Sequence, residues 1–292
     1  MSENSSLSNC KNLSYRITEF KTSLINYVLG GSEKETERLN IQSALFEREA
    51  IQTLDLAGLK QGMRCLDAGC GVGHTSLLMS KLVGKSGKVV GLDINENNID
   101  VCKQKLNRVD DNLEFLVGDL HGTTLKDSSF DFVYSRFLFQ HLTDPEKALL
   151  KISKLTTDEG IIAIEELDHG LWLSYPHNPH LRKLQRAYMN LLKLSGSDPF
   201  IARKLYGMFL KAGMRPNVAA YSVCVRMNDN SFNMLGVLMA EVLKESILNY
   251  NLMTHLEFDQ MFNGLKKYAL DPTGLVLYAI AFRIWAKKTI ST

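Results

Sequence analysis

Five short runs of mostly apolar residues alternate with longer amphipathic stretches along the middle of the chain. The runs cover residues 63–67, 88–93, 113–117, 130–135 and 160–166. Because they are apolar almost throughout, rather than at every second position, they predict strands buried on both faces, as in parallel sheets. Helical stretches at regular βα spacing separate them, so the pattern favours an α/β fold.

The regions on either side of these runs have other periodicities. Residues 16–57 predict helix, with Leu39, Leu45 and Phe46 on one stripe and charged residues opposite. Residues 180–213 predict two helical segments broken by the sequence SGSDPF, and residues 231–268 predict further helix. Two later segments predict strands, namely the alternating RPNVAAYSVCVRM from Arg215 and the apolar LVLYAIAFRIWAKK from Leu275.

The segment CLDAGCGVGHTSLLMSKLV from Cys65 joins the first strand to a helix through three glycines spaced by one residue. Such a turn lets the backbone approach a ligand closely and leaves free amides at the helix N-terminus. A dinucleotide fingerprint, G-x-G-x-x-G, requires a glycine at position 74, where this chain has His74. The spacing therefore argues against a pyrophosphate-binding turn.

Acidic or polar residues follow the apolar runs at their carboxyl ends. Asp93 ends the second run, twenty residues after Gly73, and Asp119 follows the third. In nucleoside-binding α/β folds an acid at the end of the second strand accepts hydrogen bonds from ribose hydroxyls. Asp67 and Asp119 have the alternative role of capping the turns that follow them. Because ligands of open α/β sheets bind outside the carboxyl ends of the strands, these residues predict one common site.

This series of motifs resembles that of the class I S-adenosylmethionine-dependent methyltransferases of the small-molecule type, over roughly residues 60–170. The resemblance implies a Rossmann-like seven-stranded, mostly parallel sheet with an antiparallel final strand pair. It also implies an N-terminal tail and helical lid at residues 1–57. Residues 58–292 would form the methyltransferase domain, with helical insertions at about 171–213 and 231–268.

The resemblance further implies S-adenosyl-L-methionine as cofactor and a set of residues that contact it. The glycines would lie against the methionine portion, Asp93 would hold the ribose, and the residues after Asp93 and Asp119 would cover the adenine. The complete predicted set is Tyr27, Gln42, Asp67, Gly69, Cys70, Gly71, Gly73, Asp93, Ile94, Gly118, Asp119, Leu120, Ser135 and Arg136.

Methyl transfer from a sulfonium needs mainly alignment of the reacting atoms, which accounts for roughly 7–11 kcal/mol of a barrier. A general base is required only where the acceptor must lose a proton. Candidates to contact the acceptor are His141, Glu166, His169 and Tyr175, with Asp168 beside them. His169 is the preferred base and His141 the second, although His141 is equally suited to packing or capping a helix. No metal site is predicted.

The amino-acid composition narrows the class of protein, its location and its partners. Hydrophobic content of 45%, charged content of 23% and a net charge of +2 are ordinary for a globular protein. The sequence contains no apolar run of eighteen residues, so no membrane insertion is expected. It shows no signal peptide, and its five cysteines form no CxxC pair. These two features favour a reducing, cytoplasmic location. Eight Lys or Arg against one acid between Leu181 and Arg215 are interpreted as a solvated helix face, not as a nucleic-acid site. The oligomeric state stays open.

The expected acceptor is a small or medium organic molecule, methylated on oxygen, nitrogen or carbon. The fourth strand reads DFVYSRF, which lacks the NPPY or DPPY signature of amino-group methylation in nucleic acids. Two alternatives remain at this point. One is a nicotinamide-dependent oxidoreductase on the same fold, and the other is a non-catalytic protein that binds S-adenosylmethionine.

Overall fold

The computed structural model describes residues 32–105, 111–228 and 231–289, and one eight-stranded sheet forms its centre. The strand order is β3-β2-β1-β4-β5-β8-β6, and β7 also pairs with β8. The strands are β1 (Arg64–Ala68), β2 (Lys88–Asp93), β3 (Leu113–Val117), β4 (Phe130–Arg136), β5 (Thr156–Asp168), β6 (Leu173–Tyr175), β7 (Asn217–Arg226) and β8 (Leu275–Lys287). The first five strands are parallel and β8 runs antiparallel to β5.

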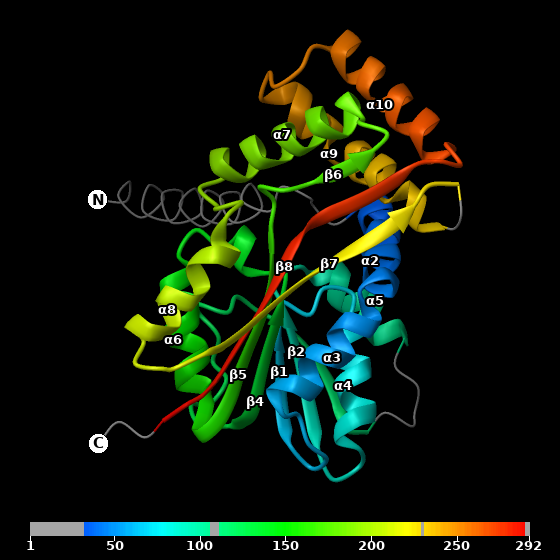
Figure 1. The fold of residues 1–292 in the computed structure, drawn as a ribbon. Coiled ribbons are helices and arrows are strands. Elements are labelled where there is room, and N and C mark those ends of the chain that lie inside the picture. Colours follow the sequence, from blue (N-terminus) through cyan, green and yellow to red (C-terminus); the bar gives the residue numbers. More distant parts are fainter. Residues whose placement is uncertain (1–31, 106–110, 229–230, 290–292) are drawn as a thin grey trace, which may run out of the picture.

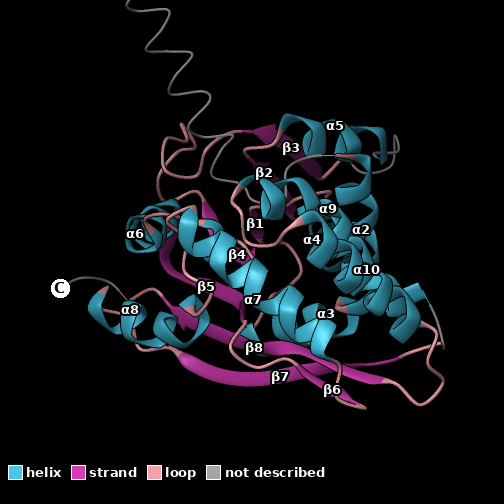
Figure 2. Ribbon diagram, turned by 90° about the horizontal axis from the view of Figure 1, so that it is seen from above, coloured by secondary structure: helices cyan, strands magenta, loops and turns pink. Residues whose placement is uncertain are grey.

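Helices cover both faces of this sheet and close one end of it (Figures 1 and 2). In Figure 1, α6 and α8 lie on one side of the sheet, α3, α4 and α5 on the other, and α7, α9 and α10 above the carboxyl ends of the parallel strands. The described helices are α2 (Glu33–Leu45), α3 (Glu47–Ala57), α4 (His74–Val83), α5 (Glu96–Lys105), α6 (Pro145–Leu155), α7 (Pro179–Leu194), α8 (Leu205–Lys211), α9 (Leu235–Asn249) and α10 (His255–Ala269), with short 3₁₀ turns η1 (Phe139–His141), η2 (Ile201–Lys204) and η3 (Ser231–Met234).

The predicted α/β sheet is confirmed, but it has eight strands where seven were expected. The additional strand is β6, which lies in the 171–213 region that was predicted to be helical. With only three residues, β6 is too short to show an alternating pattern. It forms because β8 is long enough to pair with β5 through Ile280–Lys287 and with β6 through Leu275–Leu277. Between these two segments, Ala279 has a positive φ of 44°.

Helices α7, α9 and α10 form what we call the helical cap. The buried face of α7 presents apolar side chains such as Leu184 and Leu191 to a core shared with α9 and α10. Side-chain caps fix where these helices begin. The Asn178 side chain accepts from the first amides of α7, and Thr254 and Glu257 form a reciprocal capping box at the start of α10.

Helix α2 lies beside α9, and the Lys34 and Glu241 side chains form an ion pair between them. Residues from near the start of the described chain therefore meet the helical cap formed by its later part. None of the helices in the described ranges combines the length and the apolar character needed to cross a bilayer.

Candidate active site

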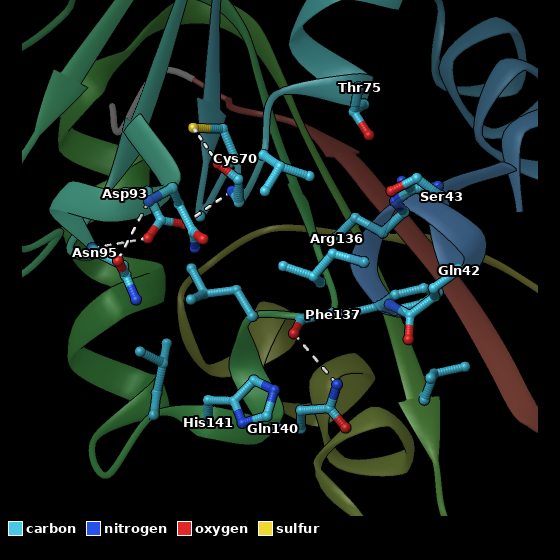
Figure 3. A pocket seen from close by; sticks show the side chains of 18 of the residues that line it. Gln42, Ser43, Cys70, Thr75, Asp93, Asn95, Arg136, Phe137, Gln140 and His141 are labelled. Atoms are coloured by element: carbon cyan, nitrogen blue, oxygen red, sulfur yellow. Dashed lines mark hydrogen bonds between the residues drawn. The ribbon is translucent and has the colours of Figure 1, made fainter. Parts of the chain in front are cut away.

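A cavity of about 320 Å³ lies at the carboxyl ends of the parallel strands, between the glycine turn, α2 and the helical cap. In Figure 3, Cys70 and Asp93 lie on one side of it, Gln42, Ser43 and Arg136 on the other, and Gln140 and His141 below. Two groups of lining residues differ in chemistry. The strand-end half consists of Asp67, Gly69, Cys70, Gly71, Val72, Thr75, Leu92, Asp93, Ile94, Asn95, Asn98, Gly118, Asp119, Leu120 and His121. The cap half consists of Phe46, Phe137, Leu167, His169, Trp172, Tyr188, Leu235, Met239, Tyr278 and Ala279.

The glycine turn between β1 and α4 depends on backbone conformations that side chains disfavour. Gly69, Gly71 and Gly73 have φ values of 76°, 54° and 80°. A Cβ on Gly73 would lie 2.7 Å from the Phe115 ring and 2.8 Å from Cys102 Sγ, whereas one on Gly71 would meet nothing within 4 Å. Gly71 thus borders open space in the cavity, while Gly73 packs the turn onto the structure behind it.

Two carboxylates, one buried and one half-buried, hold the turn in place. Asp67 Oδ2 accepts a 2.6 Å hydrogen bond from Ser76 Oγ, and burial raises the pKa of Asp67 to about 6. Asp93 Oδ2 accepts from the Gly71 amide at 2.8 Å, and its Oδ1 accepts from the Asn95 amide at 2.9 Å. Burial raises the pKa of Asp93, and these two amides oppose the shift. The Asn98 side chain is a third donor to this carboxylate, so one of its four lone pairs remains for a further donor.

The structure gathers eleven of the predicted cofactor contacts around this cavity and leaves two out. Gly73 lies behind the turn, and Ser135 is buried with its hydroxyl donating to the Ala68 carbonyl at 3.0 Å. Tyr27 lies outside the described residues. Those that line the cavity are Gln42, Asp67, Gly69, Cys70, Gly71, Asp93, Ile94, Gly118, Asp119, Leu120 and Arg136.

Helix α2 forms one side of the cavity. Arg38, which the sequence analysis did not single out, is buried there and donates two 2.7 Å hydrogen bonds to the Glu35 carboxylate. A third bond of 2.6 Å from Arg38 reaches Gln42 Oε1, so this pair orients Gln42 at the cavity. Where α2 ends, the Phe46 ring makes an edge contact with Phe137 at 5.2 Å between centroids.

Aromatic rings make up much of the cap half. The His169 ring makes edge contacts with Tyr188 at 4.9 Å and with Trp172 at 5.9 Å, and Trp172 contacts Tyr278 at 5.5 Å. The sequence analysis named only His169 among these. For Tyr188 the one signal was the abundance of Leu, Tyr and Met in the 171–213 segment, and Tyr278 lies in the last strand, outside that segment.

Both histidines proposed as bases line the cavity. Burial lowers the pKa of His141 to about 3 and that of His169 to about 4, so both rings are neutral at neutral pH. A neutral imidazole has one nitrogen lone pair that can accept a proton.

The other two predicted acceptor contacts lie elsewhere, and these assignments are corrected. Glu166 is fully buried inside β5, where its oxygens accept from the amides of Leu167 (2.9 Å) and Gln140 (3.2 Å), and burial raises its pKa to about 8. The predicted strand ended at residue 166, but β5 continues to Asp168, so Glu166 is not at its tip. Tyr175 is 71% exposed on β6 and does not line the cavity.

Comparisons with known proteins agree with this architecture. Residues 59–213 match the family described as a methyltransferase domain. A demethylmenaquinone methyltransferase of Staphylococcus aureus is 27% identical over 58% of this chain and 68% of its own length. The ubiquinone/menaquinone biosynthesis C-methyltransferase UbiE of Hahella chejuensis is 32% identical over 50% of this chain and 57% of its own length.

Solved structures show the same fold. The YcgJ protein of Bacillus subtilis has a TM-score of 0.56 at 19% identity and covers 83% of this chain and 99% of its own. Phosphoethanolamine N-methyltransferase 2 of Haemonchus contortus, solved in complex with S-adenosyl-L-methionine, has a TM-score of 0.54 at 19% identity. That match covers 85% of this chain and 56% of the other.

Proposed function

Since the chain belongs to the S-adenosylmethionine-dependent methyltransferase family, we propose that it methylates a small, largely apolar ring compound that binds in the cap half. The observation that carries this proposal is the aromatic lining of that half. Edge-contacting rings at 4.9–5.9 Å leave an apolar surface suited to a planar molecule. The family match also leaves the nicotinamide alternative without support.

The cofactor is expected in the strand-end half. Bound there, S-adenosylmethionine supplies a methyl group already activated by its sulfonium. Asp93 would accept from a ribose hydroxyl with its remaining lone pair, and Ile94, which is 54% exposed, would pack on the adenine. The open space beside Gly71 allows a close approach of the methionine portion.

The chain's contribution to the reaction is alignment and exclusion of water. Gln42 on α2 and Phe46 directly after it line the cavity, which supports a role of this helix as the lid over the cofactor proposed for residues 1–57. The names of two relatives refer to quinones, and that chemistry supports a ring acceptor for this enzyme as well.

A methyl-transfer screen tests the acceptor class. Wild-type enzyme with methyl-labelled S-adenosylmethionine should label hydroxylated bicyclic aromatic compounds faster than small polar amines such as ethanolamine. Faster labelling of the polar amines would contradict the proposal.

The cofactor assignment has its own test. Asp93→Ala removes charge-assisted hydrogen bonds of about 1.5–3 kcal/mol each, so affinity for S-adenosylhomocysteine should fall at least tenfold by calorimetry. Asp100→Ala, on the exposed face of α5, is the matched control and should bind as tightly as wild type. Equal affinities for the two variants would mean that Asp93 only holds the turn.

Two further expectations concern the basic surface around α7 and the cellular location of the protein. The basic residues around α7 are proposed to form a solvated face, since Arg203 pairs with Asp168 and Lys204 with Asp198 in the same region. Duplex binding measured by anisotropy at physiological salt should be undetectable. A reducing, cytoplasmic location is proposed because Cys224 is an exposed free thiol.

A further inference from the structure

A second, smaller cavity of about 160 Å³ lies next to the main one, between α3 and α4. Three residues line both cavities and form the boundary between them. They are Ser43 on α2, Thr75 in the first turn of α4 and Arg136 at the end of β4. All three side chains can donate hydrogen bonds, and one of them is a cation. The chemistry of this boundary therefore suits an anionic group.

Arg136 is the charged member of the boundary, and no acid of the protein neutralises it. The half-buried guanidinium donates to the Phe46 carbonyl at 3.4 Å and lies 5.5 Å from the centroid of the Phe137 ring. No carboxylate among the described residues forms an ion pair with it. Asp67 already bonds to the first turn of α4, and Glu47 lines only the smaller cavity. A half-buried cation without a counter-ion attracts an anionic ligand group, because water screens it less than a fully exposed charge.

Thr75 presents an unused donor at the same boundary. The residue is only 6% exposed, yet its hydroxyl has no hydrogen-bond partner in the described part of the chain and stays accessible from the cavity. In Figure 3 this hydroxyl points toward the side where Ser43 and Arg136 lie. Since Thr75 is in the first turn of a ten-residue helix, the helix dipole also favours negative charge there.

Gln42 adds a further donor on this side of the cavity. An arginine can only donate, so the amide oxygen of Gln42 faces Arg38 at 2.6 Å, and the amide nitrogen is left for other partners. Arg38 is itself held by the Glu35 carboxylate. Figure 3 places Gln42 on the same side of the cavity as Ser43 and Arg136. Helix α2 therefore offers this side an amide donor rather than an acceptor.

The location of Asp93 indicates which anion fits. Asp93 lies on the opposite side of the cavity from Arg136, and the proposed function places the ribose there. In S-adenosylmethionine the ribose separates the adenine from the amino-acid end, which carries the only carboxylate. With the adenine on Ile94, the methionine portion would pass the open space beside Gly71 and end near Thr75. A largely apolar ring acceptor brings no comparable anion.

We propose that Arg136, Thr75 and Ser43 bind the α-carboxylate of the cofactor and so select S-adenosylmethionine against its decarboxylated analogue. This inference rests on the cofactor position given in the proposed function. The guanidinium fork of Arg136 matches a carboxylate through two parallel hydrogen bonds, and the two hydroxyls and the Gln42 amide suit its remaining lone pairs. The analogue carries the same sulfonium and methyl group but ends in an ammonium ion, which the guanidinium repels.

Calorimetry on the full chain tests this recognition without any acceptor. Wild type should bind S-adenosylhomocysteine at least about tenfold more tightly than decarboxylated S-adenosylhomocysteine. Arg136→Met should lose at least about tenfold in affinity for the first ligand and less than about twofold for the second. Arg186→Met, on the exposed face of α7, is the matched control and should keep the wild-type preference.

Thr75→Val is a second variant, which keeps the side-chain shape and removes only the hydroxyl. It should weaken S-adenosylhomocysteine by about three- to tenfold and the decarboxylated ligand by less than about twofold. Equal affinities of wild type for the two ligands, or equal losses for both in Arg136→Met, would overturn the proposal. Should Arg136→Met fail to fold, Thr75→Val and the wild-type preference decide.

Asp93→Ala separates a failure of this inference from a failure of the proposed function. Both ligands contain the ribose, so this variant should weaken both by the same factor. If it does so while Arg136→Met changes neither ligand, the cofactor position stands and only the carboxylate site is refuted. If Asp93→Ala binds both ligands as tightly as wild type, the proposed cofactor position is refuted, and this inference with it.

Discussion

The two halves of the cavity are built in different ways. The strand-end half is defined mainly by local backbone, that is, by turn amides and left-handed glycines, together with carboxylates at the strand ends. All of these residues lie between Asp67 and His121. The cap half is defined by side chains on β5, α7, α9 and β8 and in the segments that follow α2, β4 and β5, which are far apart in sequence. A site made by local backbone geometry is specified by a short motif, whereas a site made by converging side chains is specified only by the complete fold.

This difference predicts that the largest loss of stability will come from a substitution in the glycine turn. In Gly73→Ala, a left-handed backbone costs about 1–2 kcal/mol and the clash with Phe115 and Cys102 about 1–3 kcal/mol more. The free energy of unfolding in urea should therefore fall by about 2–5 kcal/mol.

Gly71→Ala is the matched control for that experiment, because its Cβ would meet nothing within 4 Å. It should cost only the backbone term of about 1–2 kcal/mol. If both variants lost the same stability, packing behind the turn would not be what defines the strand-end half.

A second, smaller effect concerns the pH dependence of stability that arises from the buried carboxyl group of Glu166. The folded-state pKa of Glu166, about 8, lies above its ordinary value of 4.5, so the folded state binds this proton more tightly. Its stabilising contribution is complete below pH 4.5 and is lost as pH rises through 8. His141 and His169, with lowered pKa values, have the opposite effect, but only below about pH 6.5.

Between pH 6.5 and 8, Glu166 should therefore dominate, and unfolding in urea should show stability falling by about 1–2 kcal/mol. Glu166→Gln should abolish this slope, whatever it does to the absolute stability. A slope that persists in the variant would assign the pH dependence to another group.

The smallest effect on stability is expected from Tyr188→Phe, which keeps the ring that packs on His169 and removes only the hydroxyl. Stability should change by less than about 1 kcal/mol, and the affinity for S-adenosylhomocysteine should change less than twofold. KM for a hydroxylated ring acceptor should rise. A parallel loss of cofactor affinity would show that the two halves are coupled.

The same contrast explains what the sequence could predict. The bounds of β2 and β3 were predicted correctly, as was the glycine turn, because each depends on neighbouring residues. Tyr188 was missed because its position on α7 follows the same helical spacing as Leu184 and Leu191, which are core residues. Periodicity identifies an inward face, but it cannot distinguish a face that fills a core from one that lines a cavity. The role of Glu166 depended on where β5 ends, and strand ends are poorly defined by pattern.

The position of β8 has a consequence for the timing of synthesis. This strand lies between β5 and β7, contributes Tyr278 and Ala279 to the cap half, and follows every other described helix and strand in the chain. While the ribosome is still making β8, the parallel strands and the glycine turn have already been translated. The cap half still lacks the residues that β8 contributes to it. In a nascent chain every residue of the proposed cofactor half is therefore present before the proposed acceptor half is complete.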